Sequence, residues 1–63
     1  MLAHQQRVVD EKAELDVKLA KLKDFIAGRL CKSLSVDEQD RLNRQQDIMR
    51  AYSDVLEERI KAF

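Results

Sequence analysis

The residue types that perform catalysis are few and scattered in this sequence. His4 is the only histidine and lies close to the amino-terminus. The three serines, Ser33, Ser35 and Ser53, are better explained as loop, helix-cap and helix-surface residues. Nucleophilic catalysis needs a nucleophile beside a base, and a phosphate-binding loop needs several glycines, whereas this chain has one glycine. The sequence therefore argues against an enzyme.

Metal binding has equally little support. His4 and Glu11 are spaced to share a helical face, but two ligands are too few for a zinc site. Cys31 is the only cysteine, which excludes an internal disulfide and suits a reducing compartment. We expect no metal and no cofactor.

Several polar residues occupy positions where helical periodicity requires an apolar side chain. They are Gln5, Lys12, Gln45 and Arg59. One interpretation is structural, because a polar residue in a seam can fix the register of two helices or pair with Glu11 or Glu58. The other interpretation is functional. Gln5, Lys12 and Arg59 are expected near the end of the molecule opposite the loop, where a pocket would offer the two cations to an anionic ligand.

Tyr52 also has two interpretations. The Tyr52 ring either belongs to the core, with its hydroxyl reaching solvent, or stacks on a base. Lys18, Lys21 and Lys23 are typical of a solvated helix face.

The formal net charge is zero, which argues against binding to polymeric nucleic acid, since proteins that bind a polyanion normally carry a clear positive excess. No apolar run is long enough for a membrane helix.

The elements that carry these residues are two helices. An apolar seam follows helical spacing in the first half of the chain, at Val8, Leu15, Leu19, Leu22 and Ile26. Ser35 and Glu38 form a capping box that starts a second helix. We predict one domain, residues 1–63, with a helix over about 4–27, a loop over about 28–35 and a helix over about 36–62. Leu30 and Leu34 are expected to fold over the seam.

The fold class predicted is all-α: an antiparallel two-helix hairpin that oligomerises into helical bundles. The predicted seam of the second helix comprises Leu42, Gln45, Met49, Tyr52, Leu56, Arg59 and Phe63. Antiparallel pairing then places Leu15 opposite Tyr52 and Lys12 opposite Leu56. Each helix also has a second apolar edge, which predicts self-association. These edges are Val9, Ala13, Val17 and Ala20 in the first helix, and Ile48, Ala51, Val55 and Ala62 in the second.

The order of motifs resembles a known family of phage proteins. The series HQQRVVDEKAELD-K-AKL-DFI, a short loop and EQ-RL-RQ---M--YS-VLEERI-AF resembles the helical-hairpin domain of anti-CBASS and anti-Thoeris signal sponges, from His4 to Phe63. The resemblance implies a homo-oligomer, typically a hexamer. It also implies that the protein binds cyclic dinucleotides, cyclic trinucleotides or cyclic ADP-ribose isomers in the cytoplasm of the infected bacterial host, without cleaving them.

The resemblance also implies ligand-binding residues. Arg7 in the QQRVV motif, Lys18 and Arg59 in the ERI motif match its basic positions and are expected to contact phosphates. Tyr52 matches its tyrosine and is expected to stack on the ligand or line a pocket. Two alternatives stay open: a structural or adaptor coiled-coil module that binds a partner protein, and a small phage regulator that acts on a host protein or on DNA.

Overall fold

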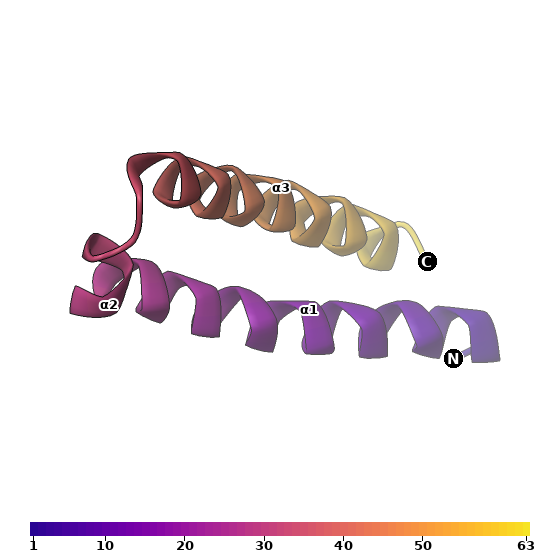
Figure 1. Cartoon of the computed structure of the whole chain (residues 1–63). Helices are drawn as coiled ribbons and strands as arrows, with labels where there is room; N and C mark the ends of the chain where they lie inside the picture. Colours follow the sequence, from indigo (N-terminus) through magenta and orange to yellow (C-terminus); the bar gives the residue numbers. More distant parts are fainter.

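The chain is entirely helical. The computed structural model describes residues 1–63 and contains three helices, α1 (Ala3–Ala27), α2 (Arg29–Lys32) and α3 (Val36–Lys61). The all-α prediction is confirmed. α1 and α3 lie side by side and run in opposite directions, so both termini are at one end and α2 is at the other (Figure 1). The molecule is a rod with extents of 46 × 14 × 13 Å.

The start of α3 follows from its cap. Ser35 Oγ accepts a hydrogen bond of 3.2 Å from the Glu38 backbone N–H, as the capping motif predicts. The reciprocal half of the predicted capping box is absent, because the Glu38 carboxylate accepts a bond of 3.0 Å from Arg41 Nε instead. Asp37 and Glu38 also place negative charge in the first turn, which the helix dipole favours.

The connection between the long helices contains a helical turn where a loop was expected. α1 ends at Ala27, and the next residue, Gly28, has an extended backbone and donates its N–H to the Phe25 carbonyl at 3.1 Å. α2 follows at once and buries Cys31, which is 3% exposed. The expectation that Leu30 covers the seam is wrong, because the turn of α2 directs Cys31 inward and leaves Leu30 72% exposed.

The core is a thin line of side chains between α1 and α3. Val8, Leu15 and Leu19 of α1 are buried, as their spacing predicts, and Leu56 of α3 is only 1% exposed. Met49 and Ile60 pack against this cluster. The least exposed positions of α3 form what we call the inner seam: Leu42, Gln46, Met49, Ser53, Leu56 and Ile60.

The inner seam differs from the predicted seam at every second position. Gln45, Tyr52 and Arg59 were expected there and are exposed instead. Both seams share Leu42, Met49 and Leu56, so the apolar heptad alone does not choose between them. Two contacts favour the observed one: partial burial of Ile60 against the core in place of Arg59, and the hydrogen bond of Ser53 across to α1.

Candidate ligand-binding face

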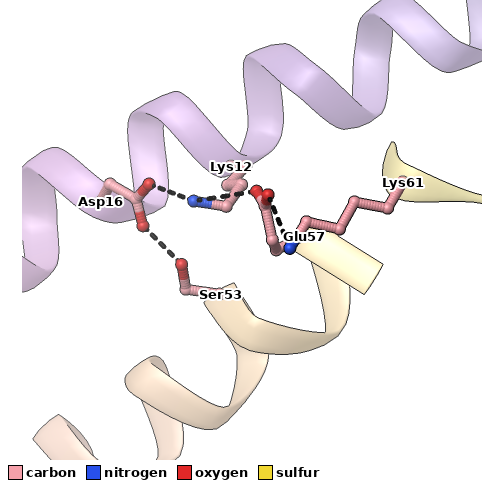
Figure 2. Close-up of polar contacts among 5 residues, drawn as sticks. All are labelled: Lys12, Asp16, Ser53, Glu57 and Lys61. Carbon is pink, nitrogen blue, oxygen red and sulfur yellow. Dashed lines mark hydrogen bonds and ion pairs between the residues drawn. The ribbon is translucent and has the colours of Figure 1, made fainter. Parts of the chain in front are cut away.

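One side of the α1–α3 pair carries a polar network that joins the helices (Figure 2). Lys12 Nζ of α1 lies 2.7 Å from Asp16 Oδ2 and 3.8 Å from Glu57 Oε2 of α3. Ser53 Oγ of α3 donates a bond of 2.6 Å to Asp16 Oδ1. Lys61 Nζ completes the series at 3.7 Å from Glu57 Oε1. We call this side the network face.

The charges of the network stabilise one another. The hydrogen bond from Lys12, followed by that from Ser53, holds the pKa of Asp16 below its usual value, against a smaller opposing effect of burial. The hydrogen bond to Asp16 raises the pKa of Lys12, again against partial burial, with further support from the charges of Glu57 and Asp54. Both groups are therefore held in their charged forms.

The network cross-links the helices, and its geometry does not form a catalytic site. Ser53 is 8% exposed, its hydroxyl donates to a carboxylate, and the structure contains no pocket beside it for a substrate. Lys12 is engaged by two carboxylates, so it is not the free cation that its position suggested. Of the two interpretations of Lys12, the ion pair is correct, although its partners are Asp16 and Glu57 instead of Glu11 or Glu58.

Part of this network escaped prediction. Asp16 lies four residues after Lys12, a spacing that favours an ion pair on a helix. Ser53 was interpreted as a surface residue because a serine between Tyr52 and Val55 gives no apolar signal. Its burial follows only from the register of α3 against α1, in which Asp16 faces Ser53 and Lys12 faces Glu57.

The four residues expected to bind ligand lie on the opposite side of the α1–α3 pair. A helical residue turns the chain by about 100°, so Arg7 lies roughly 180° around α1 from Asp16, and Lys18 about 160° from it. Tyr52 and Arg59 lie about 140° and 160° around α3 from Glu57. Since Asp16 and Glu57 both contact Lys12 on the network face, we call the other side the cationic face: Arg7, Lys18, Tyr52 and Arg59.

The cationic face is organised in two levels along the rod. Because Asp16 faces Ser53, Lys18 and Tyr52 stand at the same level near the middle. Arg7 is close to the start of α1 and Arg59 close to the end of α3, and the register places them within about one helical turn of each other. Along α1 the two levels are roughly 16 Å apart, and along α3 about 10 Å. The fold thus brings the four residues to one face as two separate pairs.

All four side chains are available to solvent. Arg7, Lys18 and Arg59 are exposed, and none takes part in an ion pair within the chain. Tyr52 is 44% exposed, which leaves part of its ring open. Glu11 and Glu14 lie on α1 between Arg7 and Lys18, so this face has little net positive potential. Anion binding here would depend on direct hydrogen bonds from the cations.

Other candidate sites receive no support. No group of three or more His, Cys, Asp and Glu side chains is arranged to hold a metal ion. Gln5, expected at the polar end of the seam, accepts a bond of 3.0 Å from the Leu2 backbone N–H through Oε1 and so serves the start of α1. None of the helices combines the length and apolar character needed to cross a membrane.

Comparison with known proteins identifies a family. The family model described as Sequestin matches residues 2–62. A 7.5 kDa protein of Enterobacteria phage T4, from the denB-rIIB intergenic region, is 36% identical over 63 residues, which are 100% of this chain and 98% of that protein. No solved structure matches the chain. The family model and the phage relative both extend over nearly all of the sequence, and the chain therefore belongs to the Sequestin family.

Proposed function

We propose that this protein binds and sequesters cyclic oligonucleotide second messengers in the infected bacterial cytoplasm, without cleaving them. The candidate ligands are cyclic dinucleotides, cyclic trinucleotides and cyclic ADP-ribose isomers. The name of the family fits a sequestering protein, and the similarity to a phage protein fits a role during infection. The choice of a cyclic nucleotide rests on the motif resemblance and on the composition of the cationic face.

The observation that carries the proposal is that three unpaired cations share one face of the molecule with an exposed tyrosine. Arg7, Lys18 and Arg59 have no acidic partner within the chain, while Tyr52 offers part of its ring. Guanidinium groups bind phosphates through paired, charge-assisted hydrogen bonds, and aromatic rings stack on bases. A small ligand with two or three phosphates and two or three bases needs both groups.

Sequestration makes a different demand from catalysis. The protein must bind its ligand tightly, and each molecule removes a fixed number of ligands. It needs no general base or nucleophile. The only buried serine, Ser53, is bonded to Asp16 on the network face, on the other side from Arg7, Lys18 and Arg59. We therefore expect the ligand to be released chemically unchanged when the protein is denatured.

Calorimetry with three ligands tests the proposal. Purified protein is titrated with 3′,3′-cGAMP, cyclic tri-AMP and cyclic ADP-ribose isomers, and the recovered ligand is identified by mass spectrometry. We expect binding of at least one ligand at submicromolar concentration, with the ligand recovered intact. Absence of binding to all of them at micromolar concentration rejects the function, and a cleaved product rejects sequestration.

Substitutions locate the site. Arg7→Ala, Lys18→Ala and Arg59→Ala should each weaken binding by about 10- to 100-fold, the effect of one lost hydrogen bond to a charged group. Tyr52→Ala should weaken binding, and Tyr52→Phe should retain most of it because the ring persists. Arg50→Ala is the matched control, since Arg50 is also exposed and unpaired but lies on the side of α3 that carries Glu57.

An adaptor module is the second candidate. The exposed apolar side chains Ile48 and Val55, at 68% and 51% exposure, favour docking of another helix. In that case Arg7→Ala and Arg59→Ala change association or stability and have no ligand affinity to change. Titration of the same variants with the three ligands therefore separates the two candidates.

A further inference from the structure

Two carboxylates stand among the cations of the cationic face. Glu11 and Glu14 lie between Arg7 and Lys18 on α1, and the four residues follow one another at intervals of four, three and four. That spacing keeps them on one stripe of the helix, within roughly 60° of arc. Glu11 is partly buried and Glu14 is exposed. Along this stripe a basic residue is followed by two acidic residues and then by a second basic one.

Glu11 belongs to the level that holds the two arginines. Lys12 faces Glu57 across the helices, so the preceding residue, Glu11, stands at the level of position 58, directly before Arg59. Arg7 precedes Glu11 by four residues, which is about 6 Å along α1. Glu11 is therefore within about one helical turn, along the rod, of both arginines.

Glu14 belongs in the same way to the middle level. Asp16 faces Ser53, so Glu14 stands at the level of position 55, about 4.5 Å along α3 from Tyr52. Lys18 follows Glu14 by four residues, again about 6 Å along α1. Each of the two pairs on the cationic face thus has one acidic residue within about a turn of it.

Neither carboxylate is neutralised within the chain. All the ion pairs of the chain involve other acidic residues. The three cations of the face and these two carboxylates together leave a net charge of +1. Each carboxylate is about 6 Å along α1 from a cation, less than the screening length of about 8 Å at physiological ionic strength. Its repulsion therefore reaches a phosphate that is bound to that cation.

This balance of charges favours some phosphates over others. A phosphate that is linked on both sides carries a single negative charge, whereas a terminal phosphate carries about two at neutral pH. Cyclic nucleotides have no terminal phosphate, but linear nucleotides such as ATP, which are abundant in cells, do. A protein that captures a scarce signal must reject them. A fixed repulsive charge provides this selectivity, because additional cations would tighten the binding of every phosphate.

We infer that Glu11 and Glu14 determine the specificity of the ligand site: their carboxylates repel terminal phosphates and so restrict the site to cyclic ligands. This inference rests on the proposed function. The repulsion grows with the charge of the ligand, and ATP carries about twice the charge of a cyclic dinucleotide. Removal of one carboxylate should therefore change the affinity for ATP by about the square of the factor for the cyclic dinucleotide.

Replacement of the carboxylates by amides of nearly the same shape tests the inference. The wild type, Glu11→Gln, Glu14→Gln and the double variant are titrated by calorimetry with whichever of the three cyclic ligands the wild type binds most tightly. ATP is added as a competitor in buffer free of Mg²⁺. For a cyclic dinucleotide, we expect each single variant to gain about threefold in affinity, and about ninefold for ATP. The double variant should lose about tenfold in selectivity, with its helix content unchanged by circular dichroism.

Asp47→Asn is the matched control. It removes the same charge from an exposed, unpaired residue that lies about 180° around α3 from the buried Leu56, on the side away from α1. We expect it to leave the ratio of the two affinities unchanged. An equal change of this ratio in Asp47→Asn, or no change in the double variant, overturns the inference. A loss of affinity for the cyclic ligand in Glu11→Gln or Glu14→Gln also overturns it, because the carboxylate would then be a direct ligand contact.

The same titrations separate this inference from the proposed function. A wild type that binds none of the three cyclic ligands removes both. A wild type that binds one of them, together with a double variant of unaltered selectivity, leaves the function in place and removes the inference alone. In 1 M salt, where the screening length is about 3 Å, the difference in selectivity between the wild type and the double variant should shrink. A difference that persists in full would exclude repulsion as its cause and overturn the inference.

Discussion

Asp16 is the residue on which the polar contacts between α1 and α3 converge. It accepts hydrogen bonds from Lys12 and from Ser53, and both favour its ionised form. A carboxyl group whose pKa is lower in the folded state stabilises the fold above its unfolded pKa, near 3.9. That stabilisation is lost as the pH falls through the lower, folded value.

Acid should therefore weaken the fold in a way that depends on Asp16. We expect the urea concentration at the unfolding midpoint of the wild type to decrease as the pH is lowered below about 4. Asp16→Asn should be less stable at neutral pH, and its midpoint should depend less on acid. The measurement is urea unfolding followed by circular dichroism from pH 2 to 7 at fixed protein concentration. Asp47→Asn, at an exposed residue with no ion pair, is the control. Equal pH profiles for the wild type and Asp16→Asn would contradict this account.

Ser53 contributes the hydrogen bond that crosses between the helices. Its replacement by alanine removes a bond of 2.6 Å and leaves Asp16 with Lys12 and solvent. Because Asp16 is 43% exposed, water can replace the lost donor, so we expect Ser53→Ala to cost about 1 kcal/mol of unfolding free energy. Asp16→Asn combined with Ser53→Ala should cost less than the sum of the two single variants. Additive costs would show that the bond contributes nothing.

At the scale of the element, the packing of α3 against α1 centres on Leu56. Leu56 is 1% exposed between Val8 and Leu15 of α1. We expect Leu56→Ala to cost about 2–5 kcal/mol, which is enough to unfold so small a domain. Leu30→Ala is the matched control, because Leu30 is 72% exposed and should change stability little. Thermal unfolding of both variants compares them, and similar losses would mean that Leu56 is not the centre of the core.

The sequence predicted the elements better than the faces of α3. The seam of α1 was correct because it carries the leucines, whereas the second apolar edge of α1 consists of valine and alanine. In α3, two alternations share Leu42, Met49 and Leu56, and apolar ranking preferred Tyr52 to Ser53. The preference was wrong because the choice depends on Asp16, a residue 37 positions away in the chain.

The wrong seam of α3 changed the predicted core more than the predicted ligand-binding residues. Arg59 and Tyr52 were assigned to the seam by spacing and to the ligand by resemblance, and their exposure is consistent with the second assignment only. That all four residues share one face follows from the register of α3 on α1, which no local pattern contains. The helix α2 was missed because Arg29–Lys32 is a single turn without periodicity.

At the scale of the whole molecule, little of the chain is buried. Only six of 63 residues are buried, which is a small core for a domain of this size. If self-association supplies the rest, the melting temperature must rise with protein concentration. We expect an increase of roughly 5 °C or more over a 100-fold range of concentration, measured by circular dichroism. Ile48→Asp should abolish this dependence, and a constant melting temperature for the wild type would indicate a self-sufficient monomer.

The polar network has a further consequence for how the chain avoids misfolded isomers. Leu42, Met49 and Leu56 repeat every seven residues, so α3 displaced by one heptad would still bury leucine and methionine against α1. In one direction the displacement brings Arg50 to Lys12 in place of Glu57; in the other it brings Ile60 to Asp16 in place of Ser53. Either isomer loses a contact that the native chain makes, and the resulting energy gap, which apolar burial alone does not provide, leaves one structure populated.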